Sequence, residues 1–182
     1  MASLPDYTAG TLHGDWFDLD DFTDTEDLHA AIQERVLSNS PIAVLGGGPV
    51  EEFTIHDDED FAGIKLDENT PLATVFALHQ ALERASSHRD ATTDAFAAWV
   101  EHHGVQKCAK DWNNAAKEFE ESYVGQMSLR EYVIDHYTDL FAQPEFKNLP
   151  EAIRNSIDYS NVATYWEDDF TEMDAYLFRA TV

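Results

Sequence analysis

Apolar residues in the segment 23–38, "TDTEDLHAAIQERVLS", recur at the spacing of an α-helix. The apolar stripe consists of Leu28, Ala31, Ile32 and Val36. Asp24 or Thr25 can cap the first turn, where acidic residues also interact favourably with the helix dipole. The segment therefore predicts a helix with one buried face and one acidic end.

Two extended stretches flank this helix. The stretch Leu12–Leu19 suits a strand that buries Leu12 and Trp16 on one face. "EEFTIHDDEDF" (51–61) alternates Phe53 and Ile55 with polar neighbours and then becomes an acidic turn. These patterns predict a small sheet that carries one helix.

The middle of the chain is helical in pattern. "TPLATVFALHQALERASS" has Thr70 as a cap and Pro71 at the first helical position, and "TTDAFAAWVEHHG" predicts a second helix that Gly104 ends. A third helix is expected to run from Val105 or Lys110 to Tyr123, and Gly125 stops it.

The last part begins with "SLREYVIDHYTDLF", in which Ser128 and Glu131 form a capping box. One or two short helices are expected from Glu151 to about Trp166, followed by the acidic turn "EDDFTEMD" and the closing strand "AYLFRATV".

The predicted fold class is α+β, in an elongated chain of three small units. Residues 1–64 form an acidic sheet-and-helix unit, 65–110 a nearly neutral helical unit, and 111–182 an acidic unit of helices with a small sheet. The first boundary falls in "GIKLDENTP", where composition and charge both change, whereas "SNSPIAVLGGGP" is a loop within the first unit.

The net charge of the chain indicates both its shape and its class of partner. The chain of 182 residues has a formal net charge of −25, divided as −14 in 1–64, −1 in 65–110 and −10 in 111–182. A compact chain of this length would be about 40 Å across, and duplex DNA carries roughly 24 charges over that length. Self-repulsion at the charge density of DNA favours an extended shape. Nucleic acid is excluded as a partner, and a DNA-binding protein is expected.

Two groups of carboxylates are the candidates to stand in for phosphates. The N-terminal acids are Asp15, Asp18, Asp20, Asp21, Asp24, Glu26, Asp27, Glu51, Glu52, Asp57, Asp58, Glu59 and Asp60. The C-terminal acids are Glu120, Glu121, Asp158, Glu167, Asp168, Asp169, Glu172 and Asp174. Aromatic residues between the N-terminal acids are expected to anchor them to a folded surface.

Enzyme and metal motifs are not found, so we predict no catalytic residue, metal site or cofactor. "DLDDFTDTED" resembles a calcium loop, but Phe22, Thr23 and His29 stand at the fifth, sixth and twelfth positions, where the loop needs other residues. "GGGP" lacks the lysine of a phosphate-binding loop, and the histidines of "EHHG" point about 100° apart on a helix.

Cellular location is suggested by what the sequence lacks. The single cysteine, Cys108, forms no intramolecular disulfide and is expected to be buried and reduced. No secretory signal or membrane span of about 20 apolar residues is recognisable. A cytoplasmic protein without membrane contact is expected.

Four segments in order give the chain its family resemblance. They are "DYTAGTLHGDWFDL", "EEFTIHDDEDF", "SYVGQMSLREY" and "LPEAIRNSIDYSNVATYWEDDF". Together they resemble the ArdA antirestriction family. The resemblance implies an elongated three-part protein, carried by mobile genetic elements, that mimics bent DNA. It also implies that the protein occupies the DNA groove of Type I restriction-modification enzymes, through their methyltransferase core, and blocks cleavage and often methylation.

The resemblance further implies a homodimer formed through the last unit. Because like-charged chains repel, the seam is expected where apolar residues lack acids, at Phe119, Tyr123, Val124 and Met127. The exposed edge of "AYLFRATV" is the alternative.

Three other interpretations stay open on sequence alone. The chain could be a DNA mimic directed at another DNA-binding protein, a salt-adapted acidic protein of unrelated function, or a small metal-dependent hydrolase. The nearly neutral middle argues against salt adaptation, because such proteins carry acids uniformly.

Overall fold

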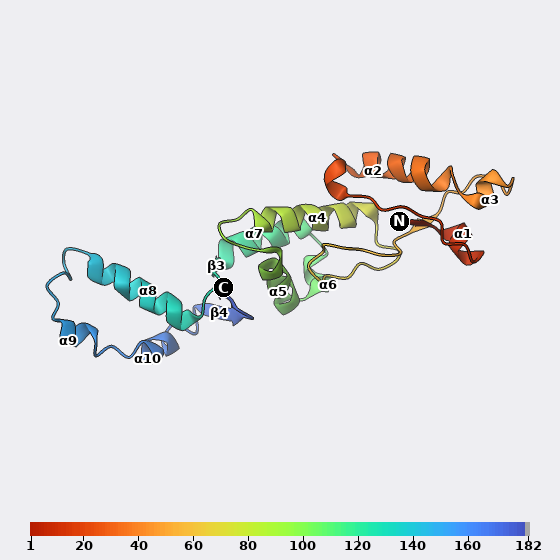
Figure 1. Ribbon diagram of the computed structural model, residues 1–182. Coiled ribbons are helices and arrows are strands. Elements are labelled where there is room, and N and C mark those ends of the chain that lie inside the picture. The colour runs from red at the N-terminus through yellow and green to blue at the C-terminus, as the bar shows by residue number, and fades with distance from the viewer. Residues whose placement is uncertain (181–182) are drawn as a thin grey trace.

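The computed structural model describes residues 1–180 as an elongated chain of helices with two small antiparallel sheets. Figure 1 shows α1–α3 at one end, α4, α5 and α7 in the centre, and α8–α10 at the other end. After α10, the chain returns to the centre, where β4 lies near β3. The predicted α+β class is confirmed, and the shape agrees with the extension that charge repulsion favours.

The N-terminal part combines a two-stranded sheet with short helices. Its elements are β1 (Ala2–Ser3), α1 (Leu4–Thr8), the 3₁₀-helix η1 (Leu19–Asp21), α2 (Thr25–Ile32), the π-helix η2 (Gln33–Leu37), α3 (Pro41–Val44) and β2 (Phe53–Thr54). Strands β1 and β2 pair antiparallel, with Ala2 opposite Thr54. The predicted helix over 23–38 is confirmed by α2 and η2, and Asp24 is its cap.

The predicted strand at Leu12–Leu19 is wrong. Apart from one bridge between Gly14 and Ala2, this segment is irregular before η1. Leu12 is 69% exposed and Trp16 is 55% exposed, so neither fills the core. Strand β1 pairs with β2 instead, because Ala2 and Ser3 are the residues buried against it.

The centre is built from α4 (Leu72–Ser86), α5 (Thr93–His103), α6 (Val105–Cys108) and α7 (Trp112–Ser122). Gly104 ends α5 at a φ of 91°, as predicted, because a residue without Cβ adopts this conformation freely. The predicted cap of α4 was wrong, because Pro71 and not Thr70 is its cap residue. Of the two starts expected for the third helix, Lys110 lies next to Asp111, which caps α7, whereas Val105 begins the separate short α6.

The C-terminal part contains α8 (Leu129–Ala142), α9 (Glu151–Arg154) and α10 (Tyr159–Thr164) with strands β3 (Tyr123–Gly125), β4 (Phe170–Met173) and β5 (Tyr176–Arg179). The capping box of Ser128 and Glu131 is confirmed. The residues expected to end a helix at Tyr123 form β3, and half of the expected acidic turn "EDDFTEMD" forms β4, whereas residues 167–169 and 174 are in turns.

The three-stranded sheet has the order β3-β5-β4. Strand β5 confirms the predicted closing strand, although Thr181 and Val182 lie outside the described residues. Because β5 is paired on both sides, the exposed edge proposed for "AYLFRATV" is wrong.

Three clusters of buried side chains follow one another along the molecule. The first surrounds Leu28 and Ile32, the second surrounds Phe96, Trp99 and Phe119, and the third joins Leu129 and Val133 of α8 to α10 and β5. The second cluster extends past residue 110, because Trp112 and Phe119 of α7 belong to it. The division at 64 and 110 stays a prediction.

Candidate functional site

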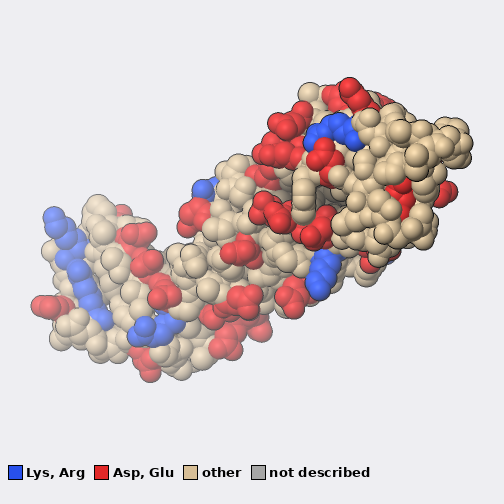
Figure 2. Space-filling view, turned by 45° about the vertical axis from the view of Figure 1, so that its right-hand side comes forward, with Lys and Arg blue, Asp and Glu red and all other residues tan. Residues whose placement is uncertain are grey.

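The two groups of acids lie on the surface. The N-terminal and C-terminal acids are exposed, except for the half-buried Asp58 and Glu120. Figure 2 shows acidic side chains gathered over the N-terminal part and continuing along the molecule. A single face thus presents many carboxylates to whatever binds it.

Local hydrogen bonds fix several N-terminal acids in place. Asp18 caps η1 by accepting a hydrogen bond from the Asp20 N–H at 3.1 Å. Asp24 caps α2 by accepting from the N–H groups of Glu26 and Asp27, both at 2.9 Å. Asp27 also accepts from the Thr23 hydroxyl at 2.5 Å. The bonds of Asp18 and Asp24 satisfy helix N–H groups, and all of these bonds hold the carboxylates at defined positions.

Aromatic anchors attach the acidic segment to the core. Phe17, Leu19 and Phe22 pack against the first cluster, although Trp16 does not. The guanidinium of Arg35 lies 4.4 Å from the centre of the Phe17 ring. The expected anchoring by aromatic residues is thereby seen at Phe17 and Phe22.

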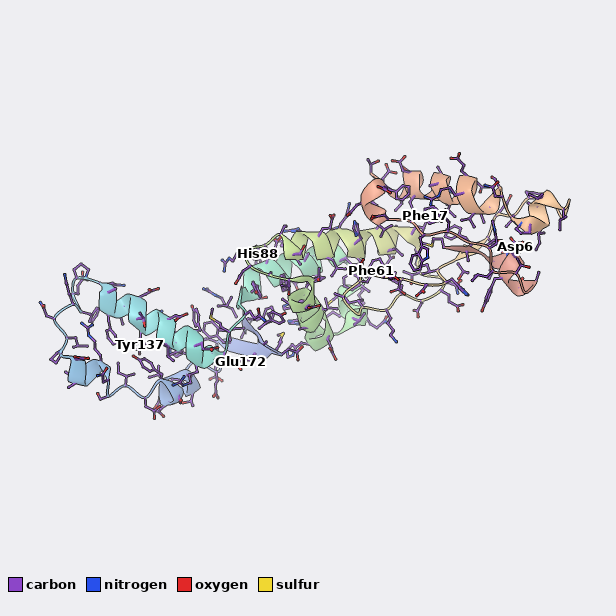
Figure 3. All side chains as sticks on the ribbon, viewed as in Figure 1. Asp6, Phe17, Phe61, His88, Tyr137 and Glu172 are labelled. Atoms are coloured by element: carbon purple, nitrogen blue, oxygen red, sulfur yellow. The ribbon has the colours of Figure 1, made fainter. Side chains whose placement is uncertain are left out.

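A hollow of about 450 Å³ brings two acidic segments together. One wall carries Asp18 and Asp20, and another carries the run 57–60. Phe17 and Phe61, which are labelled in Figure 3, also line it. Acids some forty positions apart in sequence therefore surround one concavity, and a groove of this sign attracts cationic groups.

Tight turns carry two of the acids. Asp60, at the end of the acidic run, has a φ of 66°, and Asp174, between β4 and β5, has a φ of 53°. Aspartate tolerates this left-handed conformation better than most residues with a side chain. The backbone thus favours aspartate at both turns and projects its carboxylate outward.

Two of the predicted acids form hydrogen-bonded pairs with arginine. Arg35 donates to Asp15 at 2.8 and 2.6 Å, and these hydrogen bonds lower the pKa of Asp15. Arg84 of α4 forms a two-fold pair with Glu120 of α7 and lowers the pKa of that carboxyl. Both acids are held ionised, but each already has a cation beside it. Asp15 and Glu120 therefore present less uncompensated charge than the acids without a partner.

Two C-terminal acids also have local tasks. Glu172 of β4 accepts a hydrogen bond from the Leu129 N–H at 2.6 Å, where α8 begins, and Figure 3 shows it at this junction. Asp158 caps α10 by accepting from the N–H groups of Ser160 and Asn161, both at 3.1 Å. Their replacement would therefore affect local structure as well as surface charge.

One buried acid was missed by sequence reasoning. Asp6, beside α1 in Figure 3, is 1% exposed and accepts from the hydroxyls of Ser3 and Ser40, both at 2.5 Å, and from the Ile42 N–H at 3.1 Å. Burial acts to raise its pKa, but the three hydrogen bonds outweigh that effect and lower it. Asp6 joins α1 to α3 and is not part of the surface.

The residues of the predicted dimer seam lie in different environments. Phe119 is fully buried and Tyr123 is 2% exposed, and both pack in the second cluster of their own chain. Val124 and Met127 are half-buried beside the third cluster. Only Val124 and Met127 retain surface that a partner could cover.

No helix within residues 1–180 has the length and apolar character needed to cross a membrane. The fold and the surface define an elongated α+β protein that holds exposed carboxylates at fixed positions. The family model described as "Antirestriction protein (ArdA)" matches residues 1–175, and the chain belongs to this family. No curated protein and no solved structure matches the chain.

Proposed function

We propose that this antirestriction protein is a DNA mimic that occupies the DNA-binding groove of Type I restriction-modification enzymes. It binds their methyltransferase core in the cytoplasm, blocks cleavage and methylation there, and needs no catalytic residue or cofactor. The observation that carries the proposal is the exposure of both acidic groups on a folded, elongated surface.

Fixed carboxylates make a better mimic than a flexible acidic tail. Asp18 and Asp24 are held by helix caps, and Phe17 is packed against the core. A folded surface has lost its conformational entropy before it binds, so less is lost on docking. The release of ions from a basic groove then favours the protein as it favours DNA.

The choice of target is tested by comparing enzyme classes. At matched salt, the protein should inhibit Type I enzymes irrespective of their recognition sequences, because phosphate contacts carry no sequence information. Type II nucleases that enclose a short site should be inhibited at least about tenfold less, since they offer less groove to an elongated protein. DNA cleavage assays measure both. Equal inhibition of the two classes would indicate a general polyanion effect and would overturn the proposed target.

We further propose that the protein is a homodimer joined through its C-terminal part. One chain matches about 40 Å of duplex charge, and a two-fold dimer extends the mimic along a longer groove. Strand β3 is at the edge of its sheet, and Val124 lies on it, with Met127 just beyond. Of the four residues expected at the seam, Val124 and Met127 at this edge are the two that a second chain could still contact.

Val124→Asp and Met127→Asp should each shift the protein from dimer to monomer in sedimentation, because a carboxylate would be buried at the seam without a partner. Helical content should remain at the wild-type level. Val105→Asp, which places the same charge at a residue of α6 that is 36% exposed, should stay dimeric. If both seam variants remain dimeric, the chains meet elsewhere.

A further inference from the structure

Three potential metal ligands meet where the N-terminal part touches α4. Asp20 comes from η1, and His79 and Glu83 lie one helical turn apart on α4. The Nε2 atom of His79 is 3.0 Å from Oδ1 of Asp20 and 3.7 Å from Oε2 of Glu83. One ligand atom from each of the three residues lies within 4.8 Å of the other two.

These distances fit a small divalent ion. Zinc binds imidazole nitrogen and carboxylate oxygen at about 2.0–2.2 Å, so two ligand atoms of a tetrahedral site lie roughly 3.4 Å apart. The two contacts of His79 fall on either side of that value. Little rearrangement is needed to place an ion between the three side chains.

The surroundings supply the other requirements of a site. The His79 side chain is 21% exposed, and its ring lies 6.2 Å from that of Phe76 on the same helix, which limits its orientations. Both His79 and Asp20 line the acidic hollow, which is open to water for a fourth ligand. The carboxylates at 57–60 raise the local concentration of cations.

We propose that Asp20, His79 and Glu83 bind one divalent transition-metal ion of the zinc type. One imidazole with two carboxylates suits zinc, cobalt or nickel, whereas magnesium and calcium prefer oxygen ligands alone. The bound ion links η1 to α4 and so fixes the acidic segment against the central helices. The proposal does not depend on the antirestriction target.

Two alternatives to a metal site must be separated from it. The three side chains could form ion pairs around a protonated His79 without any metal. The acidic surface could also attract metal ions weakly, without a defined site. Calorimetric titration of metal-free protein with Zn²⁺ separates these cases at about 150 mM salt, where exposed charges are screened beyond roughly 8 Å. The wild type should show one saturable site per chain.

Matched variants identify the ligands. His79→Gln and Asp20→Asn should each weaken Zn²⁺ binding at least about tenfold, in the range seen when metal sites lose a supporting group. Asp21→Asn removes the same charge from the neighbouring exposed residue and should change affinity by less than about twofold. Because the Asp20 side chain is 67% exposed, Asp20→Asn tests the site even if His79→Gln weakens α4.

Substitution with Co²⁺ gives a second measurement. Its visible absorption should report one mixed nitrogen and oxygen site in the wild type and should be lost in Asp20→Asn but kept in Asp21→Asn. The absence of saturable binding would overturn the proposal. Equal losses in Asp20→Asn and Asp21→Asn would also overturn it, because they would show that diffuse charge holds the ion.

Discussion

Neutralising four acids together, with Asp21→Asn, Asp58→Asn, Glu59→Gln and Asp60→Asn, should lower affinity for a Type I methyltransferase core by about 10- to 100-fold. Among residues 1–180, none of these four side chains has a hydrogen-bond or ion-pair partner, so the change removes surface charge without breaking a bond within the fold. An exposed charge contact contributes about 0.2–1 kcal/mol. Four of them contribute about 0.8–4 kcal/mol, and the expected loss lies within this range at about 1.4 kcal/mol per tenfold. Each single replacement should be nearly silent.

The matched control removes four acids from the nearly neutral centre, with Glu68→Gln, Asp90→Asn, Asp94→Asn and Glu101→Gln. All four are exposed, and the change in net charge is the same. Affinity should fall by less than about threefold, and the salt dependence of binding should flatten only in the first variant. Equal losses in both would show that net charge, and not its placement, determines binding. One acid whose loss alone abolishes inhibition would point to a catalytic or metal role.

Tyr123→Asp should lower the free energy of unfolding by about 3–5 kcal/mol, as expected when a large aromatic residue is lost from a core. The Tyr123 ring lies 5.2 Å from that of Phe119 and 5.7 Å from that of Phe178, and the residue is 2% exposed. A buried aspartate would add the cost of an unpaired charge. Denaturant unfolding followed by tryptophan fluorescence measures the change.

Tyr165→Asp is the control for this prediction, because Tyr165 is 76% exposed. It should change stability by less than about 0.5 kcal/mol. A Tyr123→Asp protein that is folded with wild-type stability but monomeric would contradict the core position of Tyr123 and would place it at the seam between chains.

Sequence reasoning was most accurate where local interactions decide structure. The Asp24 cap, the capping box of Ser128 with Glu131, and the stop at Gly104 each depend on residues within one helical turn, and all three are present. The error at Leu12–Leu19 has a different origin. Its apolar spacing suits a strand, but Ala2 and Ser3 occupy the place beside β2, and only long-range packing decides that competition.

The acidic surface, too, has features that the sequence predicts and features that only the fold reveals. Exposure of the acids could be predicted, because unpaired charges are rarely buried. The pairs of Asp15 with Arg35 and of Glu120 with Arg84 could not, since they join residues 20 and 36 positions apart. Asp20 and His79 are farther apart still, so no sequence spacing reveals their contact.

Competition between this protein and duplex DNA for a purified Type I methyltransferase core tests DNA mimicry most directly. The protein should displace labelled, non-specific DNA completely, without added metal or nucleotide. Its affinity should fall with rising salt in parallel with that of the DNA, because both release ions from the same groove. Binding that ignores salt, or that persists when the groove is already filled with DNA, would contradict mimicry.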